Sequence, residues 1–269
     1  MKETIWKTIL TCLLFVIMQG IIGTLIALPL AFQNKPNESP SLAYPGLLAA
    51  AIIVSDIASV WAIWKLLGTI RPKETFAIPE KPTSKRVLAI CLGTLAFITG
   101  TFGINLLTEQ IDITDQLEAE FLAMSHNWIG ILGLSIAGPV TEELVFREGI
   151  TGYWLRKGHS PWVAIIVSSL IFGLIHMNPV QVFSAFLIGL LLGTLYWKTR
   201  NIWLCSAMHI LNNSVSVLLL YIYGEESNDM FLTGLLGSAE MAWIGIFVCT
   251  LASIGLAYAF CRLMHKKEV

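Results

Sequence analysis

Three apolar stretches of this chain carry side chains that are used in hydrolytic chemistry. Glu142 and Glu143 lie in the segment GPVTEELVFREG. His176 ends the segment FGLIH, and His209 begins HILNN, four residues before Asn213. A charge near the centre of a bilayer costs roughly 2.5–3.5 kcal/mol on insertion scales. Ionisable groups at three places in apolar sequence therefore predict a water-using active site inside a membrane.

The two glutamates are expected to have different roles. On a regular helix, consecutive side chains point about 100° apart, so Glu142 and Glu143 cannot share one face of a pocket equally. Arg147 follows Glu143 by four residues, which is the favourable order for a helical ion pair. We therefore expect a structural Glu143–Arg147 pair that leaves Glu142 as the free carboxylate, suited to act as a general base. The alternative is that both glutamates are solvated at the cytoplasmic interface.

The two histidines allow several interpretations. His176 lies at the end of its apolar segment, where interfacial and helix-capping histidines are common. His209 lies two turns into its segment, with Asn213 on the same helical face. The His209–Asn213 pair could bind a metal, hold a water, stabilise an oxyanion or join two helices. Asp56 is a further carboxylate in an apolar segment, and no partner in the sequence identifies its role.

The elements that must position these residues are membrane helices. Hydrophobic residues make up 55% of the chain and charged residues 13%, and the mean hydropathy is +0.72. Soluble domains usually carry about 25% charged residues. Eight apolar segments have helical rather than strand-like length: Trp6–Phe32, Leu42–Leu67, Val87–Leu107, Trp128–Phe146, Trp162–Met177, Val180–Trp197, Ile202–Tyr223 and Ala239–Phe260. The predicted fold class is all-α, a polytopic membrane protein with about eight transmembrane helices around an intramembrane cavity.

The first apolar run is longer than the core of a signal peptide, so we expect an uncleaved first span.

The segments between the predicted helices are short. The stretch 68–86 is rich in Pro and Lys and is predicted to be a linker. The acidic stretch 109–127 has spaced apolar residues and is predicted to form a short surface helix. No internal repeat is evident, which argues against a secondary transporter.

Basic residues alternate between the two ends of the predicted helices. They gather in every second loop and at both termini: Lys2, Lys7, Arg71, Lys73, Lys81, Lys85, Arg86, Arg147, Arg156, Lys157, Lys198, Arg200, Arg262, Lys266 and Lys267. The intervening stretches hold only Lys35, or acidic residues such as Glu225, Glu226 and Asp229. By the positive-inside rule, the chain is expected in the cell membrane with both termini cytoplasmic.

The remaining composition excludes several classes of function. The chain has no basic arm and no basic–aromatic stripe, so we expect no nucleic-acid partner. Its five cysteines include no CxxC pair, which argues against a disulfide framework and against a cysteine-based zinc site.

In order and spacing, three motifs resemble those of the CAAX-protease and bacteriocin-processing family of intramembrane peptidases, also called the Abi family. They are Glu142-Glu143-x-x-x-Arg147, Phe172-x-x-x-His176 and His209-x-x-x-Asn213. The resemblance covers about residues 95–220. It implies a catalytic core at 95–223, preceded by N-terminal helices and a cytoplasmic linker (1–94) and followed by a last helix and cytoplasmic tail (224–269).

The resemblance also implies an intramembrane endopeptidase that hydrolyses membrane-associated or CAAX-like peptides. Glu142 and His176 would hold and deprotonate a water, while His209 and Asn213 would stabilise the oxyanion. Glu142 would then protonate the leaving nitrogen, with Glu143 and Arg147 in support. If a metal takes part, zinc is the expected ion and His176 and His209 are its expected ligands.

Two other classes of function remain open from the sequence. A non-catalytic membrane immunity or scaffold protein could retain the family fold and bind a peptide. An ion pathway could use buried Glu and His as a proton relay. The presence of every motif residue favours the peptidase, whose expected partners are a peptide or membrane-protein substrate and the lipid bilayer.

The depths of the predicted residues conflict on straight helices. At about 1.5 Å per residue, Glu142 and His209 fall at similar depths near the cytoplasm, whereas His176 falls toward the other face. For the three to meet, the fourth or fifth apolar segment must be tilted, displaced or broken. Gly138-Pro139, just before the glutamates, is the expected break.

Overall fold

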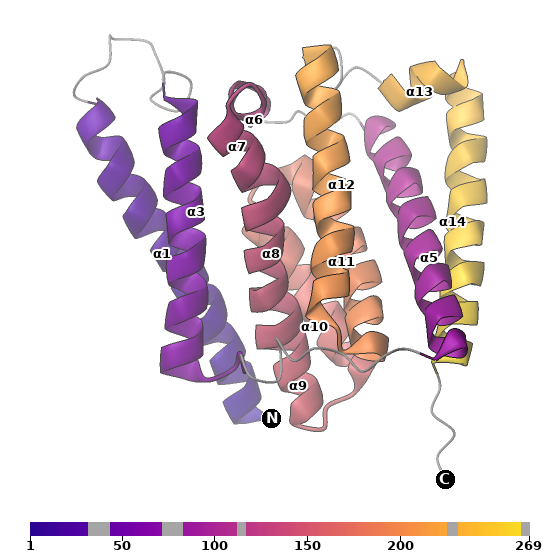
Figure 1. Ribbon diagram of the computed structural model, residues 1–269, viewed down its shortest axis with the longest axis horizontal. Helices are drawn as coiled ribbons and strands as arrows, with labels where there is room; N and C mark the ends of the chain where they lie inside the picture. Colours follow the sequence, from indigo (N-terminus) through magenta and orange to yellow (C-terminus); the bar gives the residue numbers. More distant parts are fainter. Residues whose placement is uncertain (32–43, 72–82, 112–116, 225–230, 265–269) are drawn as a thin grey trace.

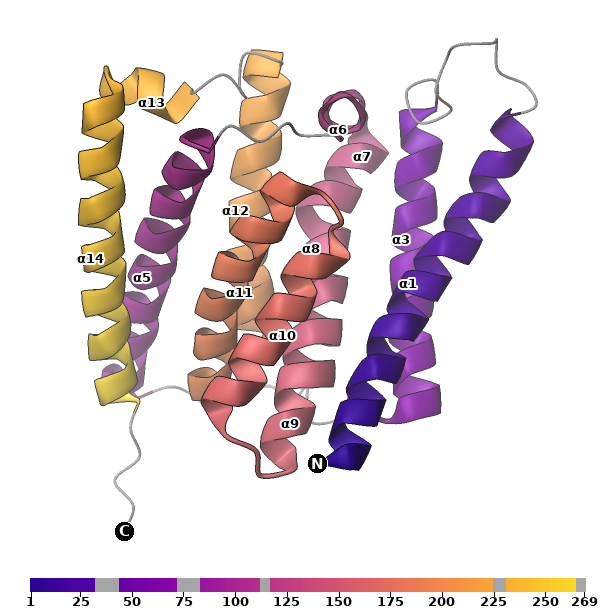
Figure 2. The same cartoon turned by 180° about the vertical axis from the view of Figure 1, so that it is seen from behind.

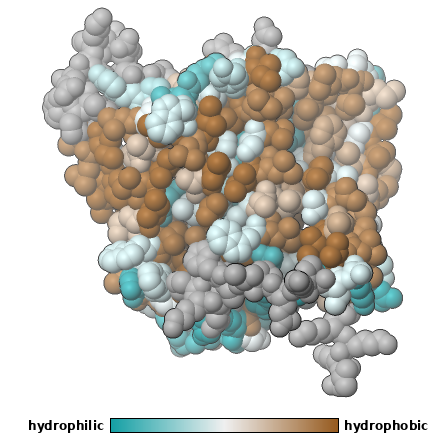
Figure 3. Space-filling view, viewed as in Figure 1, coloured by the Kyte–Doolittle hydropathy of each residue, from teal (hydrophilic) through white to brown (hydrophobic). Residues whose placement is uncertain are grey.

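The chain is a multi-pass helical membrane protein. The computed structural model describes residues 1–31, 44–71, 83–111, 117–224 and 231–264, and within these ranges every element is a helix. Seven described helices are long and apolar enough to cross a membrane: Lys2–Ile26, Pro45–Leu67, Ser84–Glu109, Trp128–Arg156, Pro179–Thr199, Ile202–Tyr223 and Ala239–Leu263. Apolar side chains form a band across the middle of the molecule, between more polar rims (Figure 3).

Two helix pairs flank a central group (Figure 1). At one end, α1 (Lys2–Ala31) packs against α3 (Pro45–Ala62), which continues as the π-helical segment η1 (Ile63–Leu67). At the other end, α5 (Ser84–Glu109) packs along α14 (Ala239–Leu263). The segments that hold the predicted site residues lie between these pairs.

Both ends of the described chain lie on one face of the bundle. In Figures 1 and 2, α1 begins and α14 ends at the same side. This arrangement agrees with a topology in which both termini share one side of the membrane. Some residues behind the charge prediction lie outside the described part: Lys35, Lys73, Lys81, Glu225, Glu226, Asp229, Lys266 and Lys267. Most of the predicted linker 68–86 lies outside it as well.

Two short helices lie at the opposite face. The predicted surface helix within 109–127 is confirmed as α6 (Glu118–Ser125). α13 (Phe231–Leu236) is fixed to the end of α5, because the Glu109 carboxylate accepts hydrogen bonds from the backbone N–H groups of Leu232 and Thr233. A side-chain cap starts the central helix: the Asn127 side chain accepts from Ile129 N–H at the beginning of α7 (Trp128–Leu132), as expected for an N-cap.

The central helix runs 29 residues from Trp128 to Arg156 and changes its winding four times. Its segments are α7 (Trp128–Leu132), η2 (Gly133–Ala137), α8 (Gly138–Glu142), η3 (Glu143–Gly152) and α9 (Tyr153–Arg156), of which η2 and η3 are π-helical. The predicted end of this span at Phe146 is wrong. The helix continues through a charged stretch because the charges there are buried as ion pairs.

The count of about eight transmembrane helices needs a correction at α10 (Pro161–Ile175). Its 15 residues rise about 22 Å, short of the roughly 30 Å of a hydrocarbon core. The chain reverses at Met177, whose φ is +51°, and returns as α11 (Pro179–Thr199). In Figure 2, this turn lies below the upper ends of α12 (Ile202–Tyr223) and α14. The chain reverses direction after α10 whether or not α10 crosses the whole membrane. The alternation of basic residues between loops therefore did not show that α10 is short.

Close packing holds α10 against α11. A Cβ on Gly173 would lie 2.6 Å from the carbonyl oxygen of Val182, and one on Gly189 would lie 2.9 Å from the Ser169 side chain. Glycine at these positions lets the two backbones approach, as small residues do between membrane helices. Ser168 on α10 donates a hydrogen bond to the carbonyl of Phe146 in η3 at 2.9 Å. The α10–α11 hairpin is thereby joined to the central helix inside the apolar bundle.

Candidate active site

His209 lies between the two glutamates. Its Nδ1 donates a hydrogen bond to Glu143 Oε1 at 2.9 Å, and its Nε2 is 3.7 Å from Glu142 Oε2. Glu143 Oε2 is also 3.2 Å from Arg147 Nε, so the predicted Glu143–Arg147 ion pair is confirmed. The side chain of Glu143 is 0% exposed and that of Glu142 is 23% exposed. Solvation of both glutamates at the interface therefore does not describe this structure.

The two glutamates approach the His209 ring at different nitrogens, Glu143 at Nδ1 and Glu142 at Nε2. They lie where the winding of the helix changes, because the π-helical segment begins at Glu143. The expectation that they would not share one face equally agrees with these contacts. Glu142 is the more accessible carboxylate, and its 3.7 Å contact is longer than a direct hydrogen bond.

The helix is not broken at Gly138-Pro139 as expected, but its winding is π-helical just before these residues, and this gives Asn213 a partner. The Gly138 N–H bonds to the carbonyl of Gly133, five residues back. In that pattern Pro139 would donate next, to Leu134, but proline has no N–H. Asn213 Nδ2 donates to Leu134 O instead, at 3.1 Å. α12 is thus fixed to the central helix one helical turn beyond His209, and one amide N–H of Asn213 remains for another acceptor.

His176 is held by the backbone of its own helix. Its Nδ1 donates to the carbonyl of Phe172 at 2.7 Å, which leaves Nε2 as the ring atom that can accept a proton or a hydrogen bond. The Phe172 ring contacts His176 and His209, with ring centroids 5.0 and 5.8 Å apart respectively. The Arg147 guanidinium lies 4.4 Å from the centroid of the same ring. The Phe172 ring therefore contacts one residue of each of the three motifs. No direct contact between His176 and Glu142 is among those described.

The described residues do not form a ready metal site. No three His, Cys, Asp or Glu side chains within them are arranged to hold one metal ion. The Nδ1 of His209 is bonded to Glu143, which leaves Nε2 as the ring nitrogen that could bind a metal. Ligation of zinc by His176 and His209 therefore stays a prediction, and the mechanism proposed below has no step that needs a metal.

Two buried polar clusters near the site were not predicted from the sequence. Glu148 pairs with Arg156 Nη1 at 2.6 Å and accepts a hydrogen bond from the Tyr196 hydroxyl. Asp56 on α3 accepts a hydrogen bond from Gln19 on α1. The charged residues that directly follow the fourth apolar segment were the signal for the first cluster. Nothing in the sequence pairs Gln19 with Asp56, which are 37 residues apart.

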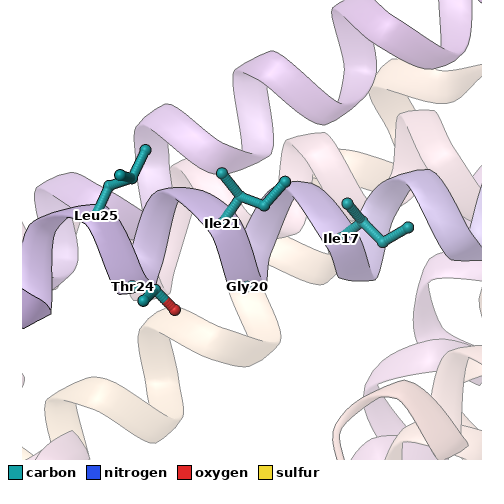
Figure 4. Close-up of a pocket in the computed structure, with 5 residues that line it drawn as sticks. All are labelled: Ile17, Gly20, Ile21, Thr24 and Leu25. Carbon is teal, nitrogen blue, oxygen red and sulfur yellow. The ribbon is translucent and has the colours of Figure 1, made fainter.

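An open apolar hollow on the outer surface lies away from these residues. It is lined by Ile17, Gly20, Ile21, Thr24 and Leu25, all on α1 (Figure 4). A hollow lined by one lipid-facing helix offers no group for hydrolysis. The intramembrane cavity expected around the site residues stays a prediction.

Comparisons with known proteins connect this geometry to a family. The family model described as "Type II CAAX prenyl endopeptidase Rce1-like" matches residues 124–215, the region that contains all the motif residues. A Bacillus subtilis (strain 168) protein named "Putative membrane peptidase YdiL" is 29% identical over 238 residues, covering 81% of this chain and 90% of that protein. No solved structure matches the chain.

Proposed function

We propose that this chain, a member of the CAAX-protease and bacteriocin-processing family, is a glutamate-dependent intramembrane endopeptidase. The observation that carries this proposal is the imidazole of His209 between two carboxylates inside an apolar bundle. Glu143, fully buried and paired with Arg147, orients the ring, and Glu142 is the accessible carboxylate on its other side. A carboxylate that accepts the hydrogen bond of one ring nitrogen, and so orients the other nitrogen toward the reaction, is a recurrent arrangement in hydrolytic sites.

In the proposed mechanism Glu142 is the general base. With its Nδ1–H donated to Glu143, His209 presents Nε2 beside the Glu142 carboxylate. A water held by Glu142 and by Nε2 of His176 loses a proton to Glu142 and attacks the peptide carbonyl. The oxyanion is stabilised by the second amide N–H of Asn213 and by His209 acting as an imidazolium, which keeps its Nδ1–H on Glu143 and donates its Nε2–H to the oxyanion. Glu142 then returns the proton to the leaving nitrogen, which breaks the peptide bond.

The proposed substrates are peptides that reach the site from the membrane. The positive-inside rule predicts that both termini lie on the cytoplasmic side. The beginning of α1 and the end of α14 lie at one face of the bundle, which supports termini on the same side of the membrane. CAAX-like peptides are the first class to test, because the matched family model is that of CAAX prenyl endopeptidases. Other hydrophobic peptides form the second class.

The test is cleavage of a peptide library by detergent-purified protein. Prenylated and unprenylated CAAX-like peptides and general hydrophobic peptides would be incubated with the protein, and products identified by mass spectrometry. An identical preparation from cells without the gene controls for contaminants. Cleavage only by the protein is expected. No cleavage of any class would favour a non-catalytic scaffold or immunity protein.

A chelator arm of the same assay addresses the metal. Activity that persists after dialysis against chelator is expected if Glu142 and His176 activate the water without a metal. Activity that is lost and then restored by Zn²⁺ would instead favour His176 and His209 as ligands.

Replacing Asn213 by Ala is expected to lower kcat by about 10²–10³-fold, because loss of one oxyanion donor typically costs that much. The matched control is Ser216→Ala on the same helix, since the Ser216 hydroxyl donates only to the carbonyl of Asn212 among its described contacts. Steady-state cleavage kinetics of both variants is the measurement. Wild-type kcat in Asn213→Ala would remove Asn213 from the mechanism.

A further inference from the structure

A second buried ion-pair cluster adjoins the site on the central helix. Glu148 is 3% exposed, and its two carboxylate oxygens have different partners. Oε1 is 2.6 Å from Arg156 Nη1, and Oε2 accepts a hydrogen bond from the hydroxyl of Tyr196, which is also 3% exposed. Arg156 Nη2 donates in turn to the carbonyl of Thr69, beyond η1. The cluster thereby joins η3, α9, α11 and the chain that follows α3.

The position of Glu148 links this cluster to the site. Glu148 follows Glu143 by five residues, and both lie in η3. Residues i and i+5 are one turn apart in a π-helix, whereas on an α-helix they point about 140° apart. The direction of Glu148 relative to Glu143 therefore depends on the π-helical winding of η3. If η3 relaxed to an α-helix, this relative direction would change, and the contacts of Glu143 with His209 and of Glu148 with Tyr196 could not both keep their present geometry.

Gly152 shows how closely the cluster is packed against η3. A Cβ at this position would lie 2.8 Å from the Tyr196 hydroxyl oxygen and 3.0 Å from Arg156 Nη1. Any side chain at residue 152 would therefore displace both partners of Glu148. Glycine here allows the hydroxyl and the guanidinium to reach the carboxylate from two different helices.

We propose that Glu148, Tyr196 and Arg156 are positioning residues that maintain the π-helical winding of η3 and so hold Glu143 against His209. None of them is proposed to touch the substrate. In the catalytic cycle their effect is on the orientation of the His209 ring, and thus on kcat rather than on KM. The part of the inference that concerns kcat rests on the proposed peptidase function, whereas the effect on His209 does not.

The decisive experiment measures His209 directly. Protein labelled with ¹⁵N-histidine would be compared by NMR as wild type, Tyr196→Phe and Gly152→Ala, with the His209 signals assigned from a His209→Gln spectrum. Tyr196→Phe removes only the hydroxyl, and Gly152→Ala displaces it without removing any polar group. Both variants are expected to shift the His209 Nδ1 and Nε2 signals, while those of His126, on the opposite face beside Tyr221, stay in place.

Tyr153→Phe is the matched control. Tyr153 is also a buried tyrosine near the end of the central helix, but its hydroxyl donates to Glu3 on α1 and not to Glu148. The His209 signals should be unchanged in this variant. Unchanged His209 signals in both Tyr196→Phe and Gly152→Ala would overturn the proposal, as would an equal shift in Tyr153→Phe.

Kinetics supply a second readout once a cleaved peptide is known. Tyr196→Phe is expected to lower kcat by about 10- to 100-fold with KM unchanged, because misplacement of a catalytic group by about 1 Å can cost 10²-fold. Wild-type kcat in Tyr196→Phe would contradict the inference. If the wild type cleaves nothing, the proposed function fails while the NMR comparison still decides whether this network positions His209.

Discussion

Glu142→Gln is expected to lower kcat/KM by about 10²–10⁴-fold, the contribution usual for a general base. The substitution keeps the shape of the side chain and removes its ability to take a proton from water. Its effect on folding should be small, because the Glu142 side chain is 23% exposed and its described ion-pair contact is the 3.7 Å approach to His209. Cleavage kinetics and thermal unfolding in detergent are the two measurements.

The control for Glu142→Gln is Glu109→Gln, the same chemical change at a carboxylate that fixes α13 and lies outside the site. It should retain wild-type kcat/KM. Wild-type activity in Glu142→Gln would show that Glu142 is not the base. The role would then have to be sought in another group, and His209 beside Glu142 would be the first to examine.

Glu143→Gln is expected to lower the free energy of unfolding by about 3–5 kcal/mol, the usual cost of removing one partner of a buried ion pair. Arg147 is 1% exposed, so its charge would remain buried without the carboxylate that now compensates it. Activity should fall as well, since Glu143 also accepts the hydrogen bond of His209 Nδ1. Unfolding would be followed by the fluorescence of the chain's nine tryptophans.

The double variant Glu143→Leu with Arg147→Met separates these two effects. Replacing a buried ion pair by apolar residues of similar size is often neutral for stability. Most of the lost stability should therefore return, whereas activity should not, because His209 still lacks its carboxylate partner. Recovery of activity in the double variant would contradict the orienting role of Glu143.

An exposed ion pair provides the stability control for the Glu143 variants. Lys157 Nζ is 3.3 Å from Glu3 Oε2, and the side chains are 41% and 61% exposed. Lys157→Met should change the free energy of unfolding by about 1 kcal/mol or less, because exposed pairs contribute little. A loss as large as that of Glu143→Gln would mean that burial does not explain the difference.

Several features of this protein depend on short-range patterns and could be predicted from the sequence. The apolar segments predict the membrane helices because each has to cover a hydrocarbon core by itself. The Glu143–Arg147 pair follows from a spacing of four residues on one helix. Gly138-Pro139 predicts the disturbance of the central helix, because proline removes a backbone donor wherever it occurs.

The prediction of the site was less complete. The motif residues are consistent with family membership, which the comparisons support, but their catalytic roles and the three-part division at residues 94 and 223 stay predictions. The sequence separated Glu142 from Glu143 by assuming regular α-helical winding. In the structure both lie near His209, because Glu143 meets Nδ1 of the ring while Glu142 approaches Nε2.

Tertiary structure alone decided the rest. The length of α10 depends on where the chain can turn back against α11, and an apolar run of residues is equally compatible with a full span and a short helical hairpin. The π-helical segment η3 is contacted from other helices by Ser168, at the Phe146 carbonyl, and by Tyr196, at Glu148. The sequence by itself determined which chemical groups enter the membrane and on which helices. Which of them meet was decided by packing, because such contacts join residues far apart in the chain and no local spacing encodes them.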